Sequence, residues 1–288
     1  MRPPVDFHIH STFSDGTCTV DEILALAISR GMRVITLSDH DTTDGLEPLS
    51  DAIKNSAYDI RLIPAIEMSS GPNGLTHILG YGASASSKPL QAQLTALRRK
   101  RVERTRKTIE ILNRLTGETL SEAFLDRADE QDHTVGRLHV ARQLVARQIV
   151  GTVEEAFSKY IGLGKPAFIP LEHISTEDAI GTLRESGIVP VLAHPIRTGL
   201  RGEELETFII HLKGAGLMGV EAFHPSASNE DAKWLYTLAR KYGLLVTGGS
   251  DFHGDRSMRT TIGEYPSGWT TWQQDTNDLQ SAINQADT

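Results

Sequence analysis

Several residue types and features are scarce in this chain of 288 residues, and each absence narrows what the protein can be. It has a single cysteine, Cys18, so neither a disulfide framework nor a thiolate zinc site can form. Aromatic residues make up only 6% of the chain, which does not favour stacking on extended nucleic acid. No apolar run reaches the length of a membrane span, and the segment after Met1 lacks the apolar core of a signal peptide. We therefore expect a cytoplasmic protein with no membrane partner.

Positive charge is also in short supply, because the formal net charge is -8 at pH 7. Such a balance argues against a broad surface for binding phosphate backbones. It does not exclude a phosphate-bearing ligand, because bound divalent cations can invert the local field of a site. The length suits one large α/β domain, or one domain with an insertion, and no obligate protein partner is evident.

Short apolar runs alternate with helical patterns through most of the chain. This alternation, with short loops, predicts a parallel sheet that is either open or closed into a barrel. In such barrels the reactive groups sit at the C-terminal ends of the strands. The tail after Gly268 shows no clear periodicity. The expected strands are 5–10, 34–38, 61–68, 76–81, 188–193, 218–223 and 244–248, and the expected helices are 20–30, 44–55, 176–185, 203–215 and 231–242.

One long segment breaks this rhythm. Residues 87–160 are helical in pattern and include a dense basic run at 98–107. We expect an inserted helical subdomain that caps the barrel mouth, so that residues 1–86 and 161–288 form the barrel domain. Most charges of the basic run are expected to form a solvated helix face. Arg101 is the exception, because it falls within the apolar stripe and is expected to point inward.

Two histidines near the start of the chain give the most specific signal. His8 and His10 alternate along an expected strand, so their side chains face the same way. Asp15 follows in a turn rich in serine and glycine. Paired imidazoles near a carboxylate are a usual metal-binding pattern, whereas a purely structural strand has little need of them. These residues therefore predict half of a metal site.

Further histidine and acidic side chains lie at the later strands. Any one of them alone is more typical of a hydrogen-bonded structural residue. Together on one rim they exceed what a single ion needs, and their burial without cations would be costly. Two or three divalent ions that share Glu67 as a bridging carboxylate would remove this cost. The expected ligands are His8, His10, Asp15, His40, Glu67, His77, His194, Asp251 and His253.

The chain resembles the PHP-domain phosphoesterases, the polymerase and histidinol phosphatase family. The matching elements run from residue 6 to residue 253, in the order typical of that family. The resemblance implies an α/β fold, a distorted (β/α)7 barrel of the PHP type, with a trinuclear metal centre. The matching elements are His8-x-His10, Ser14-Asp15-Gly16, Asp39-His40-Asp41-Thr42, Glu67, His77, Ala193-His194-Pro195 and Ser250-Asp251-Phe252-His253-Gly254.

The resemblance also implies a division of the ligands among three divalent ions. Because the set contains no sulfur donor, Mn²⁺, Fe²⁺, Zn²⁺ and Mg²⁺ all remain possible. The mixture of imidazole and carboxylate, together with the resemblance, favours Mn²⁺. The implied groups are His8, His10, Glu67 and Asp251 for one ion, Asp15, His40 and His194 for a second, and Glu67, His77 and His253 for a third.

Within the family, the length, the helical insertion and the stretches 42–45, 136–142 and 162–166 are most similar to one branch. Its members remove the 3′-phosphate of 3′,5′-nucleoside bisphosphates such as pAp, and some act as 5′-to-3′ exoribonucleases. The resemblance therefore implies a hydrolase with a small nucleotide bisphosphate as its substrate. Three alternatives stay open, namely an exoribonuclease on short 5′-phosphorylated RNA, a histidinol-phosphate phosphatase and a non-catalytic metal-binding module.

Our mechanistic hypothesis is that a hydroxide between two metal ions attacks the phosphorus in line, giving the 5′-monophosphate. The leaving ribose oxygen needs a proton, for which Asp15, His194 and His224 are the candidates. The expected substrate-binding residues, which would include anchors for a second phosphate, are Arg101, Arg137, Lys165 and His224.

Overall fold

A computed structural model of the protein describes residues 3–84, 86–123, 125, 135–170, 174–254 and 260–286. In this part of the chain, seven strands form one sheet in which each strand neighbours the next one along the sequence. The strands are β1 (Val5–Asp6), β2 (Val34–Leu37), β3 (Arg61–Ser70), β4 (Thr76–Tyr81), β5 (Val189–Leu192), β6 (Gly219–Phe223) and β7 (Leu245–Gly248).

The sheet curls into a nearly closed barrel. Its two edges meet where the Phe7 N–H donates to the Gly248 carbonyl oxygen at 3.1 Å. Just beyond, Ile9 forms an isolated parallel bridge with Phe252. The predicted seven-stranded α/β barrel is therefore confirmed.

One strand departs from the parallel arrangement that we expected. β4 runs antiparallel to both β3 and β5, while the other neighbouring strands pair in parallel. The reason is the short connection from β3, a 3-10 turn at Pro72–Gly74, because a parallel pair needs a crossover of a dozen or more residues. The beginning of β4 therefore lies at the barrel edge where the other strands end.

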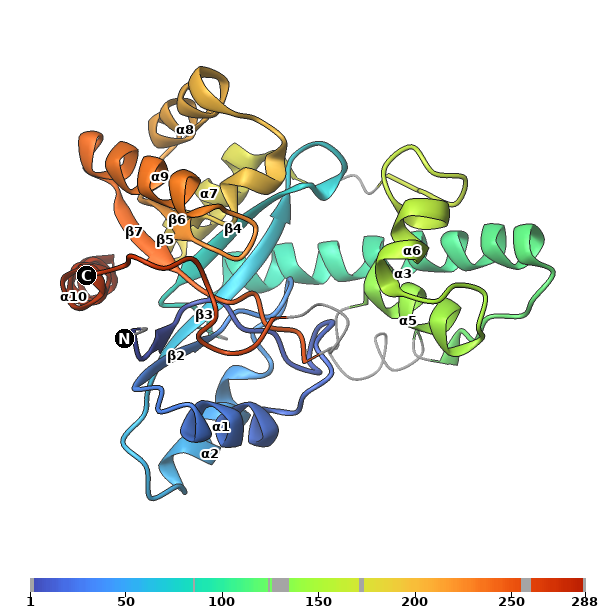
Figure 1. The fold of residues 1–288 in the computed structure, drawn as a ribbon, viewed down its shortest axis with the longest axis horizontal. Helices are drawn as coiled ribbons and strands as arrows, with labels where there is room; N and C mark the ends of the chain where they lie inside the picture. Colours follow the sequence, from blue (N-terminus) through green and yellow to red (C-terminus); the bar gives the residue numbers. More distant parts are fainter. Residues whose placement is uncertain are drawn as a thin grey trace.

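Helices pack around the outside of this barrel (Figure 1). The first of them shows how local sequence sets the bounds, because Thr19 and Glu22 cap it reciprocally and Gly31 follows its end with a φ of 68°. These helices are α1 (Val20–Ser29), α2 (Leu46–Lys54), α7 (Thr176–Glu185), α8 (Gly202–Gly214) and α9 (Asn229–Lys241).

The tail contains a helix that the sequence did not predict, α10 (Trp272–Ala286). Its buried positions have helical spacing, but Asp275 and Thr276 stand beside only two apolar residues, Leu279 and Ile283. The buried Asp275 carboxylate accepts hydrogen bonds from the Trp269 indole N–H and from Thr271, both at 2.7 Å. Because half of the buried positions of this helix are polar, its apolar residues alone do not show a helical period in the sequence.

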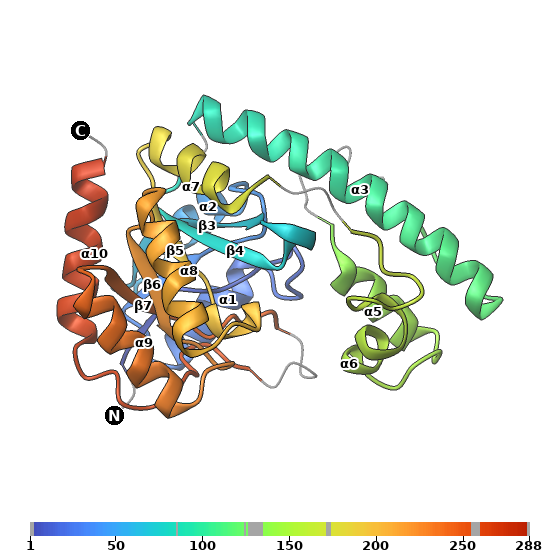
Figure 2. The ribbon, with the colours of Figure 1, turned by 90° about the horizontal axis from the view of Figure 1, so that it is seen from above.

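A helical segment lies to one side of the barrel, at the opposite end of the molecule from α10 (Figure 2). Its own apolar cluster joins Ile109 of the longest helix to Leu138 and Leu144. The start of that helix packs differently, since Leu90 and Leu94 belong to the barrel core. The division at residues 87 and 160 stays a prediction. The segment comprises α3 (Lys88–Thr116), α5 (Arg137–Ala146), α6 (Val153–Ala156) and the π-helix η2 (Phe157–Ile161).

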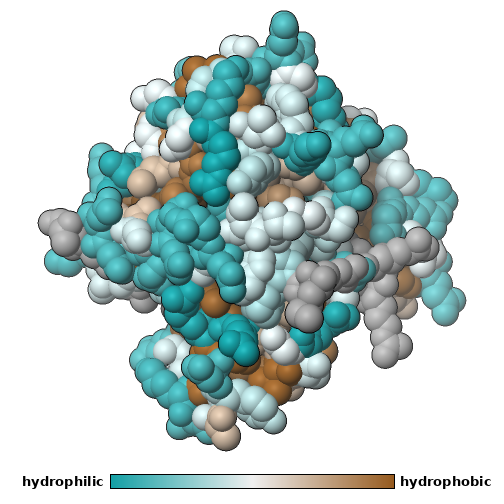
Figure 3. All heavy atoms as spheres, turned by 60° about the vertical axis from the view of Figure 1, so that its left-hand side comes forward, coloured by the Kyte–Doolittle hydropathy of each residue, from teal (hydrophilic) through white to brown (hydrophobic). Residues whose placement is uncertain are grey.

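The outer surface of the barrel side is mostly polar, with apolar colour confined to small patches on the face that Figure 3 shows. Scattered patches of this kind are ordinary on a folded protein. None of the helices among the described residues is both long and apolar enough to cross a membrane.

Candidate metal centre

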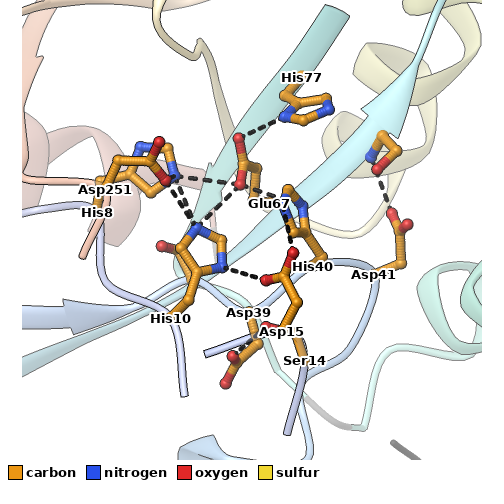
Figure 4. Close-up of polar contacts among 12 residues, drawn as sticks. His8, His10, Ser14, Asp15, Asp39, His40, Asp41, Glu67, His77 and Asp251 are labelled. Carbon is orange, nitrogen blue, oxygen red and sulfur yellow. Dashed lines mark hydrogen bonds and ion pairs between the residues drawn. The ribbon is translucent and has the colours of Figure 1, made fainter. Parts of the chain in front are cut away.

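The predicted ligands meet at one rim of the barrel (Figure 4). His8 and His10 follow β1, His40 follows β2, and Asp251 follows β7. His77 is the second residue of β4, and only the antiparallel direction of that strand brings it to the same rim. The topology that we did not predict therefore explains how a predicted ligand reaches the site.

Three of the residues that follow strands have a left-handed backbone. Asp41, His194 and Asp251 have φ values of 52°, 29° and 53°, which non-glycine residues rarely adopt. Such conformations persist only where the surroundings fix them, and they concentrate at functional sites. These turns bend the chain sharply at the rim, beside the predicted ligands.

Glu67 lies at the centre of the group. Its side chain projects from β3 and is fully buried. Each of its two oxygens faces imidazoles on different strands, as expected of a bridging carboxylate. Ring nitrogens within 3.2 Å of a Glu67 oxygen belong to His8, His10, His40, His77 and His194.

A second group forms around Asp15, on the loop before α1. The Asp15 Oδ1 atom lies 3.1 Å from His253 Nε2, and Oδ2 lies 3.9 Å from His40 Nε2. His10 Nδ1 is 4.0 Å from Asp15 Oδ1. One donor atom from each of these four residues falls within 4.8 Å of the others, and the same holds for His8, His10, Glu67 and Asp251.

The group of His8, His10, Glu67 and Asp251 is one that the resemblance implied. In the other two implied groups, His194 and His253 exchange places. The structure puts His253, rather than His194, beside Asp15, and its ring stacks on His10 with centroids 4.1 Å apart. His194 instead neighbours His77, with centroids 5.0 Å apart. Barrel closure explains the exchange, because β7 adjoins β1 whereas β5 adjoins β4.

The donors fit divalent metal ions. Within the described residues, four buried atoms of these groups make no hydrogen bond, although buried polar atoms are normally satisfied. Three of them lie within 3.2 Å of a ring nitrogen or carboxylate oxygen, but without the alignment of a hydrogen bond. Their nitrogen and carboxylate oxygen lone pairs converge on shared points, which a cation would fill. The four atoms are His10 Nδ1, Asp15 Oδ1, His40 Nδ1 and Glu67 Oε2.

In the protein without metal, the local electrostatics keep the carboxylates charged, whereas the imidazoles differ from one another. Hydrogen bonds to Asp251 and Glu67 outweigh burial and raise the pKa of His10 to about 10. Burial alone would raise the pKa of the Glu67 carboxyl, but His40 and other imidazoles outweigh it and hold that pKa well below its usual range. The Asp251 pKa is also well below its usual range, because Arg197 and the neighbouring imidazoles together outweigh burial. Burial lowers the pKa of His194 to about 4, so its ring is neutral at pH 7, the form that binds metals.

Glu221 is a buried carboxylate on β6 whose role the sequence did not reveal. Its Oε1 is 2.9 Å from His8 Nδ1, and its Oε2 accepts the His194 backbone N–H at 2.7 Å. Glu221 thus orients His8 so that Nε2 faces Glu67, as carboxylates behind metal-binding histidines commonly do. Its position on a strand, three residues before His224, is the sequence signal that could have indicated this.

The rim opens into a cavity of about 580 Å³ that lies between the barrel and the helical segment. Arg101 and Arg137, predicted as substrate-binding residues, line it. Lys165 is exposed and does not line it, and the side chain of His224 is buried outside it. The described residues facing the metal-binding groups across the cavity are Arg101, Arg104, Gly136, Arg137, Leu138, Val153, Glu154, Phe157 and Ser158.

The cationic side chains of this wall differ in their surroundings. Arg101 donates from Nε to Asp41 at 2.6 Å. Arg104 is buried, and its Nε has no hydrogen-bond partner in the described part of the chain. Burial and the nearby Arg101 and Arg137 hold the pKa of Arg104 well below its usual range. We missed Arg104, although its spacing of three from Arg101 places both on one face of α3.

Arg197 is a further cavity residue that the sequence analysis missed. It sits in a 3-10 turn (Pro195–Thr198) directly after His194, and its Nη1 is 2.7 Å from Asp251 Oδ2. The same oxygen lies 3.3 Å from His224 Nε2. His224 thus supports Asp251 from behind, and its predicted part in catalysis stays a prediction.

The comparisons with known proteins agree with this geometry. The PHP domain matches residues 6–79. A 5′-3′ exoribonuclease of Haemophilus influenzae is 30% identical over 93% of each chain. A 3′,5′-nucleoside bisphosphate phosphatase of Chromobacterium violaceum is 31% identical over 86% of this chain and 87% of its own. A structure from Bifidobacterium adolescentis, described as a metal-dependent phosphoesterase, has a TM-score of 0.84 at 27% identity and covers 98% of both chains.

Together, the barrel, the buried histidine and carboxylate groups and these relatives define a metal-dependent phosphoesterase, an enzyme of the hydrolase class. More particularly, the chain belongs to the PHP-domain family.

Proposed function

We propose that the protein hydrolyses the 3′-phosphate of 3′,5′-nucleoside bisphosphates, with pAp as a representative substrate. The observation that carries this proposal is the cavity, which has cation-binding groups on one wall and Arg104 and Arg137 on the other. Its volume of about 580 Å³ is typical of a site for one small ligand. A nucleotide with two phosphates would place one phosphate against each wall.

The metal-binding wall is proposed to hold three divalent ions, with Mn²⁺ favoured. Bound divalent ions would supply a water of lowered pKa and neutralise the charge on the phosphoryl oxygens. The chain's part is to fix the donors, with Glu67 shared between groups and Glu221 holding His8 in place. The proposed ligands are His8, His10, Asp15, His40, Glu67, His77, His194, Asp251 and His253.

The arginine wall is proposed to bind the 5′-phosphate. Arg137 lies over two aromatic rings, 5.7 Å from the centroid of Phe157 and 5.5 Å from that of Phe168, which restrict its guanidinium. Arg104 presents a buried charge with an unsatisfied donor. A phosphate dianion would satisfy both, because guanidinium groups bind phosphate oxygens through paired, charge-assisted hydrogen bonds.

A second candidate is removal of 5′-terminal nucleotides from short RNA, since the relative from Haemophilus influenzae carries the name of such an enzyme. The same arginine wall would bind the terminal 5′-phosphate, with the next phosphodiester at the metal centre. In that case the rest of the RNA would leave past Arg197, whose side chain is 45% exposed.

One assay separates these functions. Phosphate release from pAp and nucleotide release from 5′-phosphorylated oligoribonucleotides would be measured with Mn²⁺ present. We expect faster turnover of pAp. A clear preference for the oligoribonucleotides would favour the exoribonuclease, and the absence of both activities in the metal-loaded protein would contradict both candidates.

A further inference from the structure

The helical segment contacts the barrel at the two loops that carry Asp15 and His40. Arg142 of α5 donates from Nη1 to the Asp15 carbonyl oxygen at 2.5 Å. Arg101 of α3 contacts Asp41, the residue after His40. Two further hydrogen bonds join α3 to the second loop, from Gln91 Nε2 to Thr43 Oγ1 at 3.0 Å and from Arg98 Nη1 to Asp44 Oδ2 at 3.1 Å.

Asp41 links helix α3 to the strand that carries Glu67. Its side chain is fully buried, its Oδ2 accepts from Arg101 Nε at 2.6 Å, and its Oδ1 accepts the Ser69 N–H at 2.8 Å. Arg101 also donates from Nη2 to the Ser69 hydroxyl. The Asp41 N–H donates to the Glu67 carbonyl oxygen at 3.0 Å. Both carboxylate oxygens and the backbone N–H of Asp41 therefore make hydrogen bonds to β3 or α3.

The conformation of Asp41 determines where His40 lies. The left-handed φ of 52° at Asp41 turns the chain directly after His40. His40 forms an isolated bridge with Glu67, and its Nδ1 is 3.2 Å from Glu67 Oε2. Without Arg101, the buried Asp41 carboxylate would lose its hydrogen-bonded guanidinium partner, and this strained turn would lose one of its supports.

We propose that Arg101 is a positioning residue for the metal centre. Through Asp41 and Ser69 it fixes His40, so docking of α3 and cation binding at the group of His10, Asp15, His40 and His253 stabilise each other. The inference rests on the proposed metal centre and gives Arg101 a role different from anchoring a phosphate. Because such coupling is reciprocal, a bound cation must also hold α3 more firmly against the barrel.

The effect should be largest at this group. The other group shares His10 with it, but its members His8 and Asp251 are supported from the barrel itself. In the described residues, His8 is oriented by Glu221 on β6 and Asp251 is held by Arg197 beyond β5. Loss of Arg101 should therefore weaken one class of cation site and leave the other largely intact.

The test compares Mn²⁺ binding by the full-length wild type, Arg101→Met, Arg101→Lys and the control Arg99→Met. Arg99 is exposed on the same helix, so its loss should change nothing. Equilibrium dialysis over graded Mn²⁺ concentrations counts the bound ions. For Arg101→Met we expect about a 10- to 100-fold loss of affinity at one class of sites, as is typical when a partner behind a ligand is removed.

Hydrogen exchange provides the second measurement. Mn²⁺ should slow amide exchange in helix 88–116 of the wild type and of Arg99→Met, and it should do so less in Arg101→Met. Arg101→Lys keeps the charge beside Asp41 and should fall between them, and it decides the matter if Arg101→Met does not fold.

Two results would overturn the inference, and they are distinguishable. If Arg101→Met and Arg101→Lys bind Mn²⁺ as Arg99→Met does, with only a raised KM for pAp, then Arg101 anchors substrate and the coupling is wrong. If the wild type itself binds no divalent ion, the proposed metal centre fails, and the inference fails with it.

Discussion

The two walls of the cavity are built from opposite chemistry. The barrel wall contains imidazoles and carboxylates near strand ends, and several of their buried atoms make no hydrogen bond among the described residues, which favours cation binding. The helical wall presents arginines, and the buried Arg104 has a donor that calls for an anion. In the part of the chain that the structure describes, the buried polar atoms that lack hydrogen bonds on one wall are therefore not paired by groups of the other wall. A ligand that suits both must bring negative charge to two separated points, with cations between it and the barrel.

The largest effect should come from emptying the barrel wall. Treatment with a chelator should reduce phosphate release to background, because carboxylates and imidazoles alone cannot activate water or neutralise a phosphate. Adding Mn²⁺ should restore the activity, measured as phosphate released from pAp. Full activity in protein shown to be free of metal would contradict the proposal that the barrel wall acts through bound cations.

Glu67→Gln should lower kcat by at least about a hundredfold, because it removes the charge shared between the cation-binding groups while keeping the shape of the side chain. Bound Mn²⁺ should fall in parallel. The matched control is Glu154→Gln, since Glu154 is an acid that lines the helical wall of the same cavity. Equal losses in the two variants would mean that the walls do not differ in function.

A smaller effect should follow from Arg137→Ala on the helical wall. We expect the KM for pAp to rise about ten- to a hundredfold, since a hydrogen bond to a charged group contributes about 1.5–3 kcal/mol. Hydrolysis of p-nitrophenyl phosphate, which has one phosphate, should be nearly unchanged. If both substrates are affected equally, Arg137 does not discriminate between them.

The smallest effect should be on stability, through His139 of α5. Burial lowers its pKa from 6.5 to about 4, and its Nδ1 accepts the Gly136 N–H at 3.2 Å. Between about pH 4 and pH 6.5, the His139 side chain is protonated in the unfolded chain and neutral in the folded chain. The free energy of unfolding should therefore fall as the pH drops from 6.5 toward 4.

Urea unfolding of metal-free protein at pH 7, 5.5 and 4.5 measures this dependence. His139→Gln keeps an acceptor for Gly136 but does not titrate, so its stability should depend less on pH in this window. Parallel curves for the wild type and the variant would exclude His139 as the source.

The sequence was sufficient for features that depend on local geometry. The alternation of His8 and His10 is a property of one extended segment, so their shared face could be predicted from the period alone. The division of His194 and His253 could not, because it depends on which strands become neighbours when the barrel closes. The direction of β4 follows from its five-residue connection and could have been inferred from that length.

Residues that act through contacts distant in sequence were harder to predict. Arg197 and Glu221 carry no motif, and their importance appears only once Asp251 and His8 are seen beside them. Conversely, the inward direction of Arg101 was correctly predicted from the helical stripe. Its partner Asp41 could not be known, because the pair spans sixty positions of the chain.

The left-handed residues at the rim set a limit on how far this enzyme can be made heat tolerant without loss of function. Each of Asp41, His194 and Asp251 costs the fold about 1–3 kcal/mol in strain. At His194 and Asp251, a selection for heat tolerance alone would favour glycine, since glycine adopts these φ values freely. At Asp41 it would not, because glycine there would leave the buried Arg101 without its carboxylate partner. Changes at His194 and Asp251 would remove two predicted ligands, so directed evolution toward higher temperature should leave those two turns unchanged only when activity is selected as well.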